Sequence, residues 1–181
     1  MDETQQINKM AKSFGMTLLN KGSEIVKYAF KLKPAMYPRA NILNFLSQKT
    51  GISATNISLA DEKYYVVDWN TWGQIIDLDI IDTLTYKSDY FDCDNFSGLF
   101  ASRANWLYNL NSVCMAFGNI YNKDTGEFIG RHAFNLIIAQ DNGILNLYCY
   151  EPMNDGQCLV TLKNDIVIGE WRYEPDWILC F

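Results

Sequence analysis

Three turn signals divide the second half of the chain into short segments, and this spacing constrains the fold most. Asn, Asp and Gly cluster at 122–126, 140–143 and 154–156, where they supply the positive φ that tight hairpins need. The segments 127–139 and 144–150 are rich in β-branched and aromatic residues, which predicts strands. Strands joined by such short turns pair antiparallel, so the sequence predicts a meander and excludes alternating parallel strands and helices.

The first third of the chain is predicted to be helical. Apolar residues recur at helical spacing in 5–19, 23–32 and 39–49, with Gly or Pro between these segments. Residues 1–60 are therefore expected to form a helical N-terminal extension or subdomain.

A strand at 63–67 and a helix at 69–78, capped by Asp68, are predicted next. A central helix is predicted from Cys93 to about residue 107, because its apolar residues lie three and four positions apart. Residues 61–181 are expected to form one domain in which this helix packs on the meander. The expected fold class is α+β.

Charge and hydropathy exclude several partner classes. The 181 residues carry 15 basic and 21 acidic side chains, and a net charge of −6 does not favour nucleic-acid binding. No apolar run reaches the roughly 18 residues of a membrane span, and the polar segment 1–16 lacks the apolar core of a signal peptide. We expect no membrane partner and, by default, a cytoplasmic location; a homodimer is compatible with the sequence.

Five cysteines are present, and no two form a Cys-x-x-Cys pair, so the usual zinc and thioredoxin patterns are absent. An odd count leaves at least one thiol free in an uncross-linked chain. Cys114, Cys149 and Cys180 lie in apolar runs and are interpreted as small buried hydrophobic residues. Cys93 differs, because its neighbours are polar and acidic.

Cys93 lies in the first turn of the predicted central helix. Free N–H groups and the positive end of the helix dipole favour a thiolate there. Asp89, Asp92 and Asp94 oppose it by charge repulsion. A reactive Cys93 would therefore need a counter-cation, either an imidazolium or a bound metal ion.

His132 is the only histidine, so any imidazole chemistry must use it. Folding the chain about Asn142 pairs residue 132 with residue 151 and puts both side chains on one face of the hairpin. Glu151 is then expected to hold one ring nitrogen of His132 and to direct the other toward Cys93. Asn135 falls on the opposite face and is interpreted as structural.

Three segments carry a resemblance to a known family. They are Tyr86–Ser97 with its Cys-Asp-Asn-Phe core, Gly130–Asn135 with Gly-Arg-His-Ala-Phe-Asn, and Tyr150–Pro152 with Tyr-Glu-Pro. Together they resemble the papain-like or transglutaminase-like cysteine peptidases, in particular the C-terminal protease domain of the Marasmius oreades agglutinin and related microbial and phage proteins. The resemblance covers about 62–181.

The resemblance implies a papain-like or transglutaminase-like fold and a thiol protease, a hydrolase acting on a peptide or protein. It implies a catalytic triad of Cys93 as nucleophile, His132 as general base and Glu151 as orienting acid. The same triad would serve a transglutaminase-like acyl transferase.

The agglutinin domain depends on calcium, and Asp94 matches a position of its acidic ligands. The second acid of that motif is replaced here by Asn95, and a Trp of the family's His segment by Phe134. No cofactor is required by the sequence, and the resemblance allows calcium at Asp94, where it would neutralise the carboxylates around Cys93.

A second function class stays open from the sequence: a catalytically silent module that uses the same groove to bind a partner or a carbohydrate. Aromatic side chains are the candidates for such a surface. They are Tyr64, Tyr65, Trp69, Trp72, Trp106 and Trp171.

Overall fold

The computed structural model describes residues 31–161 and 166–181. Strands cover more of these residues than helices do. In chain order, the elements are β1 (Ala35–Pro38), α2 (Arg39–Thr50), the 3-10 turn η1 (Ala54–Asn56), β2 (Ile57–Leu59), β3 (Lys63–Val66), α3 (Trp69–Leu78), the 3-10 turn η2 (Ile81–Thr83), α4 (Cys93–Tyr108), β4 (Val113–Asn122), β5 (Phe128–Asp141), β6 (Ile144–Glu151), β7 (Gly156–Leu159), β8 (Val167–Ile168) and β9 (Trp171–Cys180).

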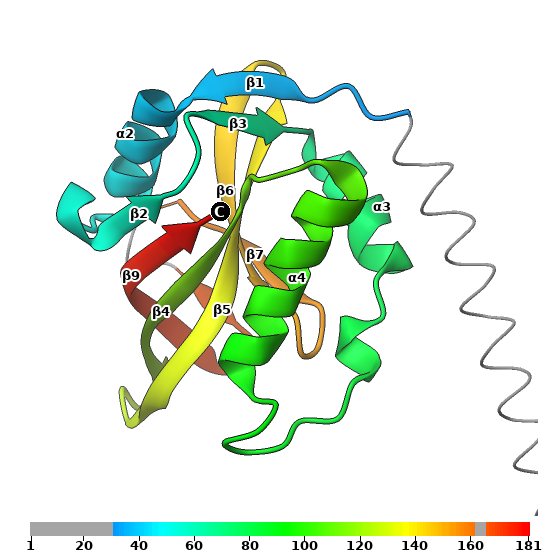
Figure 1. Ribbon diagram of the computed structural model, residues 1–181. Helices are drawn as coiled ribbons and strands as arrows, with labels where there is room; N and C mark the ends of the chain where they lie inside the picture. Colours follow the sequence, from blue (N-terminus) through cyan, green and yellow to red (C-terminus); the bar gives the residue numbers. More distant parts are fainter. Residues whose placement is uncertain (1–30, 162–165) are drawn as a thin grey trace, which may run out of the picture.

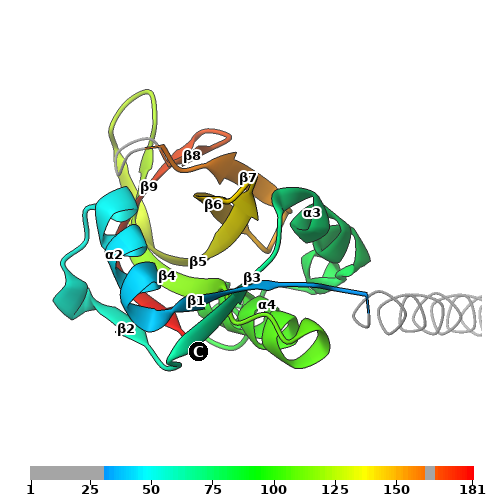
Figure 2. The ribbon, with the colours of Figure 1, turned by 90° about the horizontal axis from the view of Figure 1, so that it is seen from above.

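One large sheet organises these elements. Its strands lie in the order β2-β9-β4-β5-β6-β7, and β8 pairs with β9 beside this path. All its pairings are antiparallel except that of β2 with β9. The sheet curls strongly, so that β7 comes to lie near β8 when it is seen from above (Figure 2). A separate two-stranded sheet joins β1 to β3.

The central strand β5 separates two hydrophobic cores. Phe134, Leu136 and Ile138 belong to the core that also contains residues of α2, β2, β6 and β9. Ile137 and Ala139 point to the other face and pack with residues of α3 and α4. Figure 1 shows α4 lying across β5 on this second face. The period of two along a strand thus assigns alternate residues of β5 to different cores.

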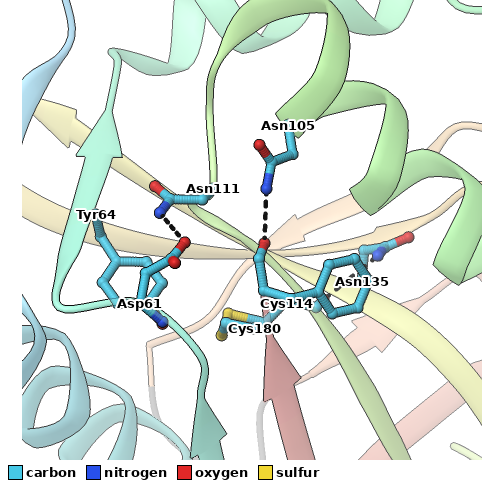
Figure 3. The surroundings of a disulfide bond; sticks show 8 residues. Asp61, Tyr64, Asn105, Asn111, Cys114, Asn135 and Cys180 are labelled. Atoms are coloured by element: carbon cyan, nitrogen blue, oxygen red, sulfur yellow. Dashed lines mark hydrogen bonds between the residues drawn. A yellow bond between two sulfur atoms is a disulfide. The ribbon is translucent and has the colours of Figure 1, made fainter.

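A disulfide joins β4 to β9 inside the first core. Cys114 and Cys180 are directly opposite in the register of these strands and are bonded to each other (Figure 3). The interpretation of both as free buried thiols is therefore wrong, whereas Cys149 is a buried free thiol. Nearby, Asn111 Nδ2 donates to Asp61 Oδ2 at 2.7 Å, which ties the start of β3 to β4.

The two helices predicted in the middle of the chain are confirmed. Asp68 caps α3, since its Oδ1 accepts from Thr71 N at 2.8 Å. α4 begins at Cys93, and Asn95 Oδ1 accepts from Asp92 N at 3.1 Å across the helix start. Within the described residues, no helix is long and apolar enough to cross a membrane.

The expected fold class, with a helical N-terminal part in a papain-like arrangement, is wrong. Of the three helices predicted there, α2 is present, and the segment 5–19 and nearly all of 23–32 lie outside the described residues. Two strands stand where none was expected. β1 ends at Pro38, which disfavours helix in the preceding Tyr37, and Ile57 and Leu59 in β2 point into the first core.

A glycine permits the close approach of β4 and β9. The register between these strands shifts after Phe117, which leaves Asp176 as an extra residue on β9. A Cβ atom on Gly118 would lie 2.1 Å from Glu174 O and 2.6 Å from Pro175 Cα. Both are backbone atoms of a paired strand, so they cannot move aside alone.

We predict that Gly118→Ala lowers the free energy of unfolding by about 2 kcal/mol or more, because the methyl group forces the β4–β9 backbones apart. Urea unfolding followed by fluorescence measures this. Gly130→Ala on the neighbouring strand is the matched control, since a Cβ there meets nothing within 4 Å. An equal effect of the two substitutions would refute the close approach.

Candidate functional site at the start of helix α4

The first turns of α4 are fixed against the end of β5. The ladder between β5 and β6 stops at Asn135 and Tyr150, so the Phe134 carbonyl lies beyond it. Ser97 Oγ donates to Phe134 O at 2.9 Å, and Asn135 Nδ2 donates to Ser97 O at 3.0 Å. All these groups are buried. The interpretation of Asn135 as structural is confirmed. The helix provides hydrogen-bonding partners for backbone and side-chain groups of β5 at the point where β6 no longer pairs with it.

This packing of α4 against β5 brings Cys93 close to His132. Cys93 lies four residues before Ser97, on the same side of α4 and one turn nearer the helix start. His132 lies two residues before Phe134, on the same face of β5. One helical turn and two strand residues span similar lengths, about 5.4 and 6.7 Å. The Cys93 thiol lies near enough to the His132 ring to raise the pKa of His132.

Glu151 holds the other side of the His132 ring. The distance between His132 Nε2 and Glu151 Oε2 is 2.6 Å, and only 2% of Glu151 is exposed. The Tyr173 hydroxyl donates to Glu151 Oε2 at 3.4 Å, and Met153 N donates to Oε1 at 3.4 Å. A buried carboxylate needs such a set of donors and a cationic partner to offset its desolvation.

The contact arises from a different register than expected. β5 pairs with β6 through a two-residue turn, with Asp141 opposite Ile144 and Asn135 opposite Tyr150. Glu151 pairs instead with Gly156 of β7. The prediction that residues 132 and 151 are directly opposite is therefore wrong by two positions. A shift of two keeps both side chains on the predicted face, so they still meet, now diagonally.

The electrostatic surroundings make His132 a cation at neutral pH. Burial of the ring is the largest single influence and lowers the pKa of His132. Hydrogen bonds with Cys93 and Glu151, and the charges of both groups, act in the opposite direction and prevail. Together they raise the pKa of His132 from 6.5 to about 9. The pair with Glu151 is therefore an imidazolium–carboxylate ion pair.

A cleft of about 250 Å³ opens beside this pair. Its walls come from the β6–β7 turn and from the β8–β9 hairpin, and Trp171 contributes a ring that is 41% exposed. The lining residues are His132, Glu151, Met153, Asn154, Ile168, Gly169, Glu170, Trp171 and Tyr173. An exposed aromatic ring thus lies next to several hydrogen-bonding groups.

Asp94 offers a poor setting for calcium. Its side chain accepts from the Asn95 N–H at 3.0 Å. A hydrogen bond with Asp92, helped by partial burial and by the Asp92 charge, raises the pKa of the Asp94 carboxyl. The part of the chain that the structure describes holds no group of three or more side chains suited to a metal ion. Because Ca²⁺ takes six to eight oxygen ligands, we derive no step through it.

The aromatic candidates are dispersed. Tyr64 and Trp72 are buried in the two cores. Trp69 stacks on Tyr148, with ring centroids 3.6 Å apart. Tyr65 and Trp106 are exposed elsewhere, which leaves Trp171 as the candidate that lines the cleft.

Two site residues were missed from the sequence. Ser97 is a buried polar residue on an apolar helix face, which is a recognisable signal. Tyr173 lies two residues after Trp171, on the same face of β9, and its sequence neighbours gave no comparable signal.

Comparisons with known proteins support the fold. No protein-family model and no curated protein matches the sequence. A solved structure titled "PSL1a-E64 complex" matches with a TM-score of 0.53 at 18% identity, over 80% of this chain and 51% of that one. The crystal structure of Polyporus squamosus lectin bound to the human-type influenza-binding epitope Neu5Acα2-6Galβ1-4GlcNAc matches with a TM-score of 0.56, also at 18% identity, over 80% of this chain and 49% of that one.

The chain thus spans about half the length of both structures, and this likeness shows the fold alone. It nevertheless corrects the family expected from three short segments, because one of the two titles names a lectin and neither names a peptidase. The assignment as a papain-like thiol hydrolase acting on peptides is overturned. The domain boundary at residue 60, the cytoplasmic location, calcium and a homodimer stay predictions.

We predict that the free energy of unfolding falls as the pH rises from about 6.5 to 9. Below 6.5 the ring is protonated in the folded and the unfolded chain, and the ion pair contributes fully. Above 6.5 the unfolded chain loses the proton first, so the contribution disappears as the pH passes the folded pKa of about 9. The loss should be on the order of 3 kcal/mol.

Urea unfolding at several pH values tests this. Glu151→Gln is the control, since it keeps the shape but removes the charge that holds the proton, and its profile should be much flatter. A parent profile as flat as that of the variant would contradict the ion pair.

Proposed function

We propose that this fold is a binding module that takes a carbohydrate in the cleft beside His132. The observation that carries the proposal is the position of Trp171, an exposed ring next to buried polar groups. A sugar ring has an apolar face that can lie on an aromatic side chain, and hydroxyl groups that need hydrogen-bonding partners. Clefts with an apolar surface and a few fixed polar groups are typical of small-ligand sites.

The charges of the cleft favour a neutral sugar. Glu151 and Glu170 both line it, and the positive charge of His132 is offset by Glu151. The chain as a whole carries a net charge of −6. An anionic sugar would meet repulsion at this position, whereas hydroxyl groups could donate to the carboxylates.

The lectin named above supplies a test ligand. Its title names a trisaccharide that ends in sialic acid, and the match with this chain covers 49% of that lectin. The proposal therefore concerns the neutral part, Galβ1-4GlcNAc, as the first ligand to measure. The sialylated form serves as the comparison, because it adds one carboxylate to the same two sugars.

We predict that Trp171→Ala weakens binding of Galβ1-4GlcNAc by about tenfold or more, because it removes the stacking surface. Isothermal titration calorimetry measures the change. Trp106→Ala is the matched control, since this tryptophan is 81% exposed but lies in the last turns of α4, away from the cleft. Equal losses in both variants, or tighter binding of the sialylated trisaccharide, would contradict the proposal.

We also propose that Cys93, His132 and Glu151 are chemically active residues beside the cleft. What supports this is the hydrogen bond between His132 and Glu151, together with the influence of the nearby Cys93 thiol on the pKa of His132. An imidazolium beside a thiol stabilises the thiolate, which is the nucleophilic form. Such a thiolate could accept an acyl group from a bound ligand, so acyl transfer is the second candidate function.

We predict that Cys93 reacts with iodoacetamide at neutral pH at least tenfold faster than the buried Cys149. His132→Ala should remove this advantage, because it removes the cation beside the thiol. Mass mapping of each alkylated cysteine over time measures the rates. Labelling of Cys93 at the same rate in parent and variant would show that the three residues do not act together.

A further inference from the structure

Four of the five cysteines lie in one row across the large sheet. Cys180 of β9 is opposite Cys114 of β4, and Cys114 is opposite Leu136 of β5. Leu136 is in turn opposite Cys149 of β6, and Cys149 is opposite Cys158 of β7. Directly paired residues share a face, and the whole row borders the first core. The row thus contains one disulfide and one pair of thiols, separated by a leucine.

The separating residue keeps the two pairs apart. Strands are about 4.8 Å apart, so the Cα atoms of Cys114 and Cys149 are separated by roughly twice that distance across Leu136. A disulfide needs Cα atoms within about 7 Å. Exchange between the two pairs is therefore excluded in the folded chain, and the nearest partner along the row for each remaining thiol is the other.

The two pairs differ in their backbone geometry. Val160 N donates to Leu147 O at 2.8 Å, which makes 147 and 160 a hydrogen-bonded pair. Antiparallel pairs alternate between bonded and non-bonded kinds, so Cys149 and Cys158, two residues along, are again hydrogen-bonded. Their Cα atoms should be about 5.5 Å apart, within the disulfide range. Cys114 and Cys180 are closer, at 4.2 Å, as in a non-bonded pair.

The two thiols also differ in access and ionisation. Cys149 is fully buried, and burial raises the pKa of its thiol well above the usual value. Cys158 lies near the sheet edge and is partly exposed. A hydrogen bond from Cys149, which prevails over the opposing effect of burial, lowers the pKa of the Cys158 thiol to about 7. Cys158 therefore has both the solvent access and the thiolate fraction that oxidation requires.

We propose that Cys149 and Cys158 form a reversible redox pair, in which Cys158 is oxidised first and Cys149 resolves it as a disulfide between β6 and β7. With hydrogen peroxide as oxidant, the Cys158 thiolate attacks one peroxide oxygen, the O–O bond breaks, and a sulfenic acid forms as hydroxide leaves and is protonated to water. The Cys149 sulfur then attacks the Cys158 sulfur and the S–O bond breaks. The Cys149 proton leaves with the released oxygen as a second water. Two thiols and one peroxide thus become one disulfide and two waters.

The geometry explains why this disulfide would be reversible. Cβ atoms in hydrogen-bonded pairs lie near the upper end of 4.5–5.5 Å, whereas a disulfide holds them at about 3.8 Å. Closing the bond must pull β7 toward β6, and a strained disulfide is more easily reduced. Glu151 lies two residues beyond Cys149 on the same face of β6, and the residue opposite it on β7 is Gly156. Oxidation would therefore also move the backbone beside the cleft.

The test treats the folded full-length chain with one equivalent of hydrogen peroxide, blocks the remaining thiols with iodoacetamide, and maps peptides by mass. We expect a Cys149–Cys158 cross-linked peptide, with both residues losing alkylation in equal amounts. Dithiothreitol should reverse this bond at concentrations that leave Cys114–Cys180 intact. Cys158→Ser should leave Cys149 as an unreacted thiol, and Cys149→Ser should stop Cys158 at a sulfenic acid that dimedone traps.

Three results would overturn the proposal. They are oxidation of Cys158 to a sulfinic acid while Cys149 stays a thiol, a disulfide of either residue with Cys93, Cys114 or Cys180, and no oxidation of either residue. The cross-link is measured in the parent chain, so the test holds even where a serine variant does not fold.

Discussion

The alternation of side chains along β5 is the constraint on which the rest of this structure depends. Fourteen residues form this strand, and from Phe134 to Ala139 its apolar side chains alternate between the two hydrophobic cores. The face toward α4 carries Asn135 and Ile137, and the other carries His132, Phe134 and Leu136. Because the period is fixed at two, moving β5 by one residue would exchange the contents of both cores and expel His132 from its pocket. Packing on two sides thus fixes the position of a single polar residue.

The buried charge of Glu151 requires a particular location in the sheet. A carboxylate inside a continuous ladder would face apolar neighbours and backbone groups that are already paired, at a cost of several kcal/mol. Glu151 instead stands at the end of β6, where the chain turns and Met153 N is free to donate to it. Tyr173 reaches it from β9 across the curled sheet, and His132 from the uncovered end of β5. Donors from two strands and one turn thus reach the same carboxylate.

Local signals in the sequence predicted local structure well. The cap at Asp68, the helix that starts at Cys93 and the turn at Asn142 are predicted from a few neighbouring residues, and the corresponding elements are present. Such signals could not predict contacts between residues that are far apart in the sequence. The parallel pairing of β2 with β9 joins residues more than a hundred positions apart, and the Cys114–Cys180 bond spans 66. The cysteines were interpreted from apolar neighbours, which describe burial and carry no information on which strand lies opposite. The meeting of His132 with Glu151 was expected for a partly wrong reason. The turn lies one position later than predicted, which shifts the pairing by two residues, and a shift of two keeps both side chains on the same face.

The β6–β7 hairpin connects the two kinds of chemistry in this molecule. On one face it carries Cys149 and Glu151, opposite Cys158 and Gly156 respectively. A Cβ atom on Gly156 would lie 2.6 Å from Ile168 Cγ2 of β8, so β8 packs closely against β7 here, and the β8–β9 hairpin also presents Trp171. A bond between Cys149 and Cys158 would draw β7 toward β6. The wall of the cleft and the cysteine row therefore share the β6–β7 hairpin. Cys149 of the row is two residues from Glu151, so a disulfide at Cys149 would shift the backbone that carries this carboxylate.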